Sequence, residues 1–366
     1  MEAGHERSNN RADTTAGRQP SGPQNAPSDT TPGGPLPGDR GRGLLIGGAI
    51  VLGLLFLTVG AIALVLVAGP EGSDGGRVVA PETFQEKYVS GEGADKIVVL
   101  PVVGTIGAEG TTSLVTPAAT PETLRNQLRQ AAEDGKVKAI VLEINSPGGG
   151  VVASDQMHGS LKDFKETTKK PVVVSMGQTA ASGGYYISTA ADKIVANENT
   201  LTGSLGVIFS YLNFEDAADK FGLEEEVVKS GKYKDIGSPF RKPTGKELEI
   251  LQTLVDESYD DFVDVIVEGR NLSEDRVREL ADGRVYSGLQ AKSLGLVDEL
   301  GDLEKAAELS RELAGIEEAT VVRYERVPGL LELLRARLAP SEPEALKVLK
   351  TAGLSTTPQL QYLYRP

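Results

Sequence analysis

The strongest feature of the hydrophobic pattern is one uncharged run near the N-terminus. Residues 44–68, LLIGGAIVLGLLFLTVGAIALVLVA, include no charged side chain in 25 positions. A helix of that length rises roughly 37 Å, enough to cross a hydrocarbon core of about 30 Å with some tilt. A buried core helix seldom has so long an uncharged run, and a cleaved signal peptide has a short basic start and a shorter apolar core. The run is therefore expected to be one transmembrane helix.

After this run, apolar segments alternate with amphipathic ones. β-like apolar runs occupy residues 96–106, 136–145, 171–176, 192–198 and 320–326. Helical patterns occupy residues 121–134, about 151–167, a short stretch from about 180, and 244–269. Parallel strands that are buried on both faces have continuous apolar runs and are connected through helices. The pattern therefore predicts an α/β domain over residues 96–326, with largely parallel strands and flanking helices.

The flanking segments are expected to lie outside this domain. Residues 69–95 are expected to be a linker, and residues 327–366 a C-terminal helix and a tail that docks on the domain or trails from it. Residues 1–43 contain six prolines and almost no large apolar side chain, which predicts a disordered tail. Arg40 and Arg42 precede the apolar run, while Glu71 and Asp74 follow it. This asymmetry predicts a cytoplasmic N-terminus at the cell membrane and an exocytoplasmic domain.

Charge and the missing residue types narrow the possible chemistry. The formal net charge is −14, and an acidic protein repels a phosphate backbone, so no nucleic acid is expected as a partner. The chain has no cysteine and two histidines, His5 in the N-terminal tail and His158. Scattered carboxylates with one usable histidine do not make a typical metal site. Nucleotide-binding glycine motifs are also missing, so neither a metal nor a cofactor is expected.

Two glycine-rich stretches each follow an apolar run and precede a helical pattern. INSPGGG spans 144–150 and AASGGYY spans 180–186. Glycines can bring backbone N–H groups close to a ligand oxygen, and Ser182 at a helix start could be a nucleophile. Either stretch alone is equally compatible with a tight turn or close packing, but two in succession favour a catalytic site. With His5 in the tail and only His158 left, a lysine whose ammonium form is destabilised by burial is the candidate base.

A set of longer motifs resembles the signal peptide peptidase A type of serine protease, peptidase family S49, also called protease IV-like. The resemblance covers about residues 96–305, and its length matches the short form with one catalytic domain. The motifs occur in the family's order: INSPGGGV, MGQTAASGGYYISTAADKIVA, TLTGSLGV, KSGKYKDIGSP and DGRVYSGLQAKSLGLVDELG.

The resemblance implies a ClpP/crotonase-like fold and a Ser-Lys dyad. The positions that match the family's site are the nucleophile Ser182, the general base Lys234, the oxyanion donors Gly149 and Gly183, and the lysine-orienting Ser204. Only the motif match separates Lys234 from the nearby Lys232. Which glycine of 148–150 donates to the oxyanion stays open.

The resemblance also implies a homo-oligomeric ring in which neighbouring subunits complete each site. In this family the lysine of the dyad lies in the same chain or in a neighbouring repeat, and here one repeat carries both residues. The implied substrates are remnant signal peptides and unfolded protein segments. The sequence thus predicts a membrane-anchored serine endopeptidase. Two alternatives are a crotonase-like acyl-CoA enzyme, disfavoured by the exported domain, and a catalytically silent oligomeric membrane scaffold, disfavoured by Ser182 and Lys234.

Overall fold

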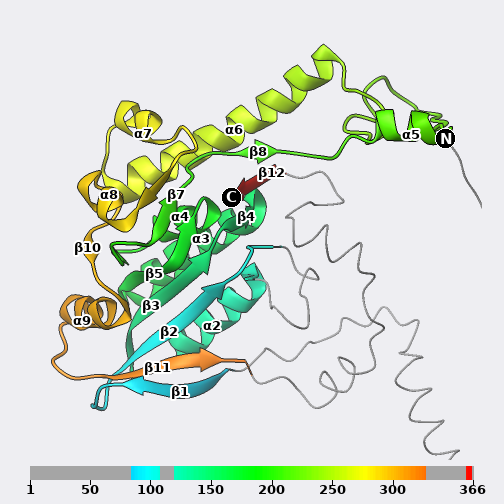
Figure 1. Ribbon diagram of the computed structural model, residues 1–366. Coiled ribbons are helices and arrows are strands. Elements are labelled where there is room, and N and C mark those ends of the chain that lie inside the picture. The colour runs from blue at the N-terminus through cyan, green and yellow to red at the C-terminus, as the bar shows by residue number, and fades with distance from the viewer. Residues whose placement is uncertain (1–83, 108–118, 327–359, 365–366) are drawn as a thin grey trace, which may run out of the picture. The chain divides into compact units, whose positions relative to one another are not determined.

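The computed structural model describes residues 84–107, 119–326 and 360–364 (Figure 1). These residues belong to one compact unit, Val79–Pro366. The predicted N-terminal tail, the predicted transmembrane helix at 44–68 and residues 327–359 of the C-terminal segment lie outside the described residues. Among the helices that are described, none combines the length and the apolar character that a bilayer crossing requires.

The predicted apolar runs form the centre of one large sheet. Within the described residues, nine strands pair in the order β1-β11-β2-β3-β5-β6-β10, with β7 beside β5 and β9 beside β7. The pairs from β11 to β10 are parallel, as is β5 with β7, whereas β1–β11 and β7–β9 are antiparallel. The strands are β1 Gln85–Ser90, β2 Lys96–Val103, β3 Val137–Ser146, β5 Val172–Ala181, β6 Lys193–Ala196, β7 Leu201–Gly203, β9 Val285–Ser287, β10 Glu299–Leu300 and β11 Thr320–Glu325.

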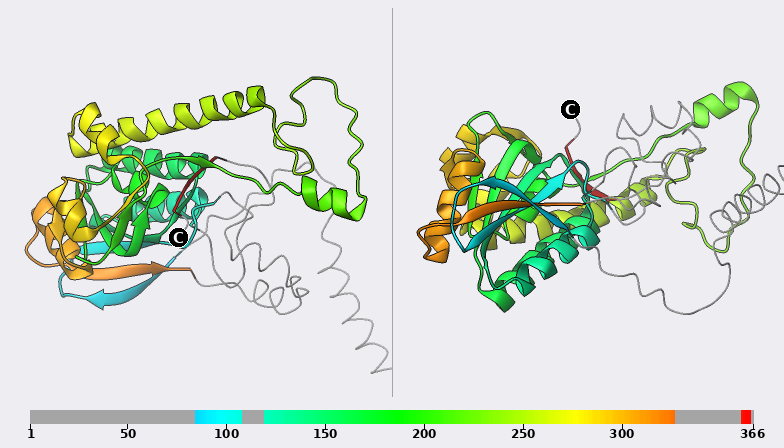
Figure 2. Two further views of the ribbon diagram at one scale, coloured as in Figure 1. Left: turned by 45° about the horizontal axis from the view of Figure 1, so that its top comes forward. Right: turned by 90° about the horizontal axis from the view of Figure 1, so that it is seen from below.

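Helices cover both faces of this sheet, as Figure 2 shows from two further directions. Val98 and Leu100 of β2 face the larger core, under α2, α3 and α4, while Ile97 and Val99 face a smaller core under α9. Burial on both sides explains why the central strands are continuously apolar. The helices are α2 Pro121–Glu133, α3 Val151–Thr168, α4 Gly183–Ser188, α5 Glu215–Phe221, α6 Gly245–Arg270, α7 Glu274–Leu280, α8 Gly288–Ser293 and α9 Leu303–Ala314.

The longest helix, α6, is anchored in the core only over its C-terminal half. Phe262 and Ile266 are buried there, whereas Leu248 and Leu254 near its start are exposed. Thr244 begins the helix with a capping box. Its side chain accepts a hydrogen bond from the Glu247 backbone N–H, and the Glu247 side chain accepts one from the Thr244 backbone N–H. Twenty-six residues of helix rise roughly 39 Å. The segment before α6 joins the end of the helix that lies farther from the core.

A second, small sheet brings the end of the chain to the first glycine-rich stretch. It consists of β4 Gly148–Gly150, β12 Leu360–Leu363 and β8 Ile208–Phe209, with β12 in the middle and antiparallel to both. Tyr362 lies opposite Gly149, and Leu360 lies opposite Phe209.

Two expectations from the sequence need correction. Residues 85–90, within the expected linker, form strand β1, which pairs with β11. The side chains of this strand are mostly exposed, so it has no apolar run that would have indicated it. The short helix α4 begins at Gly183 and not near residue 180, because Ala180 and Ala181 continue β5 beside β7.

Candidate active site

Ser182 stands at the turn from β5 into α4 in a strained conformation. Its φ is 53° and its ψ is −115°, which a non-glycine residue adopts at a cost of about 1–3 kcal/mol. Its N–H donates to the Gly203 carbonyl at 2.8 Å, which joins the turn to the end of β7. The side chain is 1% exposed, and its Oγ has no hydrogen-bond partner among the described residues. A buried, unpaired hydroxyl in a strained turn indicates a functional group rather than a packing residue.

The glycines around Ser182 are required by close approach of the backbones. A Cβ on Gly183 would lie 2.5 Å from the Ser154 Oγ, and one on Gly149 would lie 1.8 Å from the Ile106 oxygen. Gly148 has φ 97°, and a Cβ there would lie 2.6 Å from the Gly183 nitrogen. The structure therefore brings both predicted oxyanion donors, Gly149 and Gly183, next to Ser182.

The C-terminal strand β12 lies across these glycines like a bound peptide. The Tyr364 N–H donates to the Pro147 carbonyl at 2.8 Å. Along an antiparallel ladder, hydrogen-bonded and non-hydrogen-bonded pairs of residues alternate. Tyr362 and Gly149 lie two positions from Tyr364 and Pro147, so they face each other as a hydrogen-bonded pair. The Tyr362 oxygen lies 3.1 Å from the position that a Cβ on Gly183 would take. A carbonyl group of an extended chain thus lies beside the two glycines.

An aromatic pocket receives the Tyr362 side chain, which is fully buried. Its ring stacks on Tyr186 at a centroid distance of 4.9 Å and lies 4.8 Å from Phe262. The Tyr362 hydroxyl donates to the Ser258 carbonyl at 2.8 Å. Sequence reasoning missed this pocket. The signal was present in the second tyrosine of SGGYY, one helical turn after Ser182.

His158 lies behind this pocket and not at Ser182. Its ring meets Tyr186 edge-on at a centroid distance of 5.3 Å. Burial lowers the pKa of His158 to about 4, so the imidazole is neutral near pH 7. In the described residues, no cluster of three or more histidine, aspartate or glutamate side chains could hold a metal ion.

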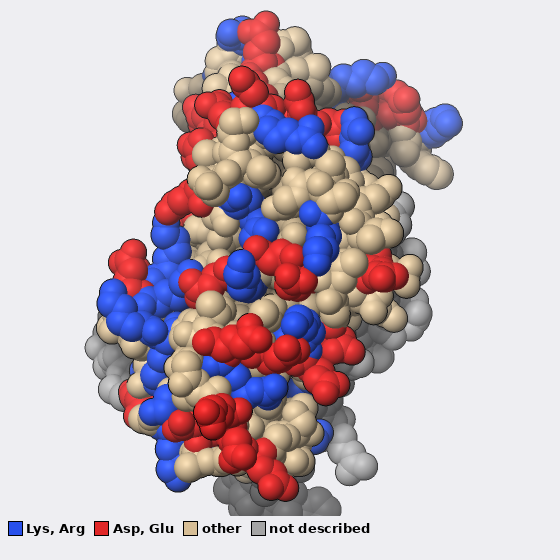
Figure 3. Space-filling view, turned by 90° about the vertical axis from the view of Figure 1, so that its left-hand side faces the viewer, with Lys and Arg blue, Asp and Glu red and all other residues tan. Residues whose placement is uncertain are grey.

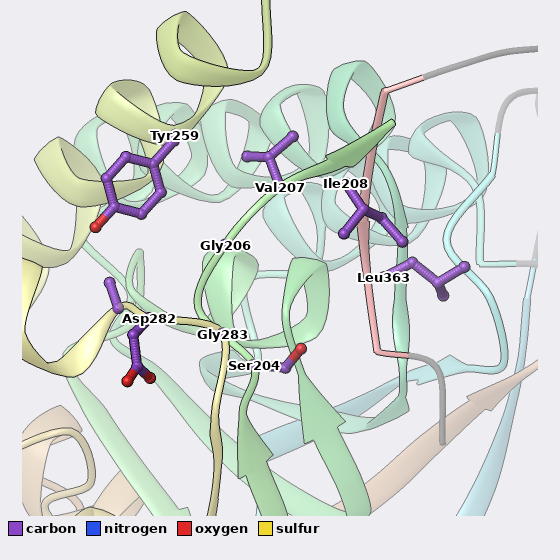
Figure 4. Close-up of a pocket in the computed structure, with 9 residues that line it drawn as sticks. Ser204, Gly206, Val207, Ile208, Tyr259, Asp282, Gly283 and Leu363 are labelled. Atoms are coloured by element: carbon purple, nitrogen blue, oxygen red, sulfur yellow. The ribbon is translucent and has the colours of Figure 1, made fainter. Parts of the chain in front are cut away.

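Ser204, directly after β7, lines a cavity. It also has a positive φ, 49°, and its N–H donates to the Arg284 carbonyl at 2.7 Å. The cavity has a volume of about 340 Å³ and lies between β8, α6 and the loop before β9 (Figure 4). Leu363 of the C-terminal strand is one of the residues that line it, so β12 borders the cavity.

Lys234 is exposed and lies on a loop between α5 and α6. The next residue, Asp235, accepts from Arg241 at 2.9 Å, and Arg241 donates to Glu247 in the first turn of α6 at 2.6 Å. The same Arg241 holds the pKa of Asp235 well below its usual range. Lys232 is exposed on the same loop.

Within one chain, the structure does not bring Lys234 to Ser182. The loop is fixed at Glu247, whereas the aromatic pocket contacts α6 at Phe262, fifteen residues later. That spacing is roughly 22 Å along the helix. In Figure 1, α5, which precedes this loop, lies well to the right of α4 and of the sheet.

The fold and this constellation define a class, the serine peptidases with a ClpP-like fold. A Clp protease family model matches residues 115–201, which run from before α2 to β7. A second model, Peptidase family S49, matches residues 164–317. The chain belongs to peptidase family S49, the signal peptide peptidase A type of serine protease.

Three named relatives, from Enterococcus faecium, Arabidopsis thaliana and Haemophilus influenzae, support this assignment. A protein of Enterococcus faecium named signal peptide peptidase SppA is 36% identical over 300 residues, 79% of this chain and 86% of the relative. The chloroplastic serine protease SPPA of Arabidopsis thaliana is 36% identical in sequence over a region that covers 61% of this chain and 33% of that protein's length. Protease 4 of Haemophilus influenzae is 38% identical in sequence over a region that covers 55% of this chain and 32% of that protein's length. A mutant ClpP1 from Listeria monocytogenes superposes over 57% of this chain and 93% of that chain, with TM-score 0.37 and 21% identity.

Proposed function

We propose that the protein is a membrane-anchored serine endopeptidase in which Ser182 of one copy works with Lys234 of a second copy. The observation that carries the proposal is the buried, unpaired Ser182 Oγ beside two glycine backbones, with an extended strand of the chain lying over them. This is the arrangement that a peptide substrate would take at a nucleophile.

In the proposed reaction, each of these groups has a role. The Ser182 Oγ attacks the carbonyl carbon of the peptide while its proton passes to the neutral amine of Lys234. The N–H groups of Gly149 and Gly183 stabilise the oxyanion of the tetrahedral intermediate. The lysine then gives its proton to the leaving amine, and the acyl group remains on Ser182. A water molecule then attacks the acyl carbonyl and gives a proton to the lysine. The bond between the acyl group and the Ser182 Oγ breaks, and the lysine returns that proton to the Oγ, while the Ser204 hydroxyl orients the amine.

A second copy is part of the proposal because Lys234 is remote from its own Ser182. The segment that carries Lys234 also exposes Phe221, Leu223 and Val228, which are apolar side chains that a subunit contact would bury. A head-to-tail contact of this kind closes into a ring when the rotation between copies is a simple fraction of a turn. This agrees with the homo-oligomeric ring that the family resemblance implies.

The groove favours extended peptide substrates. A strand that takes the place of β12 pairs with β4 on one side and β8 on the other, so only an unfolded segment can enter. With residues 44–68 as a membrane anchor, the site would face the exocytoplasmic side at the membrane surface. Remnant signal peptides and unfolded protein segments are substrates with these properties.

The direct test is hydrolysis of fluorogenic peptides by the wild type, Ser182→Ala and Lys234→Ala. Loss of the nucleophile is expected to reduce turnover by about six orders of magnitude while the thermal midpoint changes little. A fluorophosphonate should label the wild type at Ser182 and leave the alanine variant unlabelled. Retention of several per cent of the wild-type rate by Ser182→Ala would reject the site. Turnover of an acyl-CoA in place of peptides would favour the crotonase-like alternative.

A further inference from the structure

The loop of Asp282, Gly283 and Arg284 is bonded directly to the backbone beside the nucleophile. Gly203 pairs with Val285, the Ser204 N–H donates to the Arg284 carbonyl, and the Gly283 N–H donates to the Leu205 carbonyl at 3.1 Å. Because Gly203 also accepts from Ser182, the position of this loop relative to the site is fixed by backbone contacts. Side-chain changes in the loop can therefore alter charge without moving Ser204.

The cavity beside Ser204 has a mixed lining of apolar and polar groups. Its lining consists of Gly206, Val207, Ile208, Ala281, Gly283 and Leu363, with Ser204, Tyr259 and Asp282 as the polar members. Asp282 is the one lining residue with a formal charge near pH 7. In Figure 4 the carboxylate of Asp282 points away from Ser204.

Arg284 holds Asp282 in this orientation. Its Nε donates to both carboxylate oxygens at 2.8 Å, and its terminal nitrogen forms an ion pair with the same carboxylate. The Arg284 backbone N–H donates to the carboxylate as well, at 3.1 Å. The guanidinium lowers the pKa of Asp282 to about 2, so the pair stays charged throughout the range in which a lysine could act as base.

A free carboxylate at this place would oppose a lysine base. A lysine must be neutral when it accepts the serine proton, and an opposite charge within about 4–6 Å favours the ammonium form. Tyr259 lines the cavity itself, with Arg278 5.6 Å over its ring. The other charged or titratable groups nearby have partners of their own. Arg278 pairs with Asp260 and Glu274, Arg276 pairs with Glu279, and the Tyr286 hydroxyl donates to the Leu280 carbonyl.

We propose that Arg284 is a positioning residue that sets the pH range of activity. It keeps the Asp282 carboxylate away from the Lys234 amine of the second copy, which enters this cavity next to Ser204. The inference rests on the proposed function and extends it. Arg284 touches neither the substrate nor the reacting atoms, and it acts through Asp282.

The experiment measures kcat/KM against pH from about 6 to 10 with a fluorogenic peptide and the full-length protein in detergent. Arg284→Gln releases Asp282, so the acid limb of the profile should move upward by about 0.5–1 pH unit with its shape retained. Asp282→Asn combined with Arg284→Gln should restore the wild-type limb. Added salt should shrink the displacement, because the pair is partly exposed.

A matched control is Arg276→Gln, which breaks an arginine–carboxylate pair on α7 that does not line the cavity. Its profile should coincide with that of the wild type. The inference would be wrong if Arg284→Gln lowered kcat/KM equally at every pH. It would also be wrong if the acid limb of Arg284→Gln moved no more than that of Arg276→Gln. Neither result would contradict the proposed dyad. Full activity of Lys234→Ala would instead reject the proposed function and the inference with it.

Discussion

Ser182 and its neighbours show what single residues reveal in a sequence and what they conceal. The string AASGGYY indicated a serine among small residues, and the structure has it in a turn with φ 53°. The string did not show why Gly183 must be glycine. That reason is the Ser154 Oγ, which comes from α3 and is 29 residues away in the chain. Such contacts between distant segments leave no mark in local composition.

Replacement of Gly183 by alanine tests this packing. The new Cβ would lie 2.5 Å from the Ser154 Oγ, so Gly183→Ala should lower the free energy of unfolding by about 1–3 kcal/mol. Ser154→Ala removes the opposing atom, and the double variant should recover part of the loss. Thermal or urea unfolding measures both effects.

Gly159→Ala on α3 is the matched control, since a Cβ there meets nothing within 4 Å. It should leave stability unchanged or raise it by about 0.5–1 kcal/mol, because alanine favours a helix interior. If Gly183→Ala is as stable as Gly159→Ala, the backbones near Ser182 are not as close as described.

At the scale of elements, the sequence predicted the strands that have runs of apolar side chains. It did not predict the strands that form only because their backbones pair with other strands. β2 and β3 are buried on both faces, and the sequence predicted them from apolar runs at 96–106 and 136–145. β1 is mostly exposed, and β4 consists of three glycines without side chains. β12 is a strand because it pairs with β4 and β8, which are remote in the sequence. The sequence predicted a tail that docks on the domain or trails from it, but not the place where it docks.

The C-terminal strand is expected to compete with substrate. Tyr362 fills the aromatic pocket, and β12 occupies the edge of β4 that a peptide needs. Deletion of residues 360–366 should therefore lower KM several-fold for a peptide with tyrosine before the cleaved bond, with kcat little changed. Steady-state kinetics measure both. Deletion of residues 365–366 alone keeps β12 and should leave KM as in the wild type. Equal KM values for the two truncations would show that β12 does not obstruct the groove.

At the scale of the whole molecule, charge does not collect on the face shown in Figure 3. Lysine and arginine side chains alternate there with aspartate and glutamate, and the described part of that face has no broad field of one sign. Among its described residues, that face therefore offers no charged surface on which a ligand of one sign would collect.

The separation of Lys234 from Ser182 was the feature that the sequence could not predict. Lys234 follows Ser182 by 52 residues, which is compatible with contact or with wide separation. The length of α6 and the Arg241 contacts to Asp235 and Glu247 decide between them, and they hold the lysine away. We propose a dyad shared between copies to account for this separation.

Mixed assemblies of two inactive variants test that claim most directly. Ser182→Ala and Lys234→Ala subunits are co-expressed in equal amounts, purified together through different tags, and assayed with a fluorogenic peptide. A shared dyad predicts about a quarter of the wild-type activity, because half of the sites keep Ser182 and half of their neighbours keep Lys234. Ser182→Ala mixed with the Ser182→Ala/Lys234→Ala double variant is the control and should be inactive. A mixed assembly as inactive as that control, or an active Lys234→Ala variant on its own, would contradict the account.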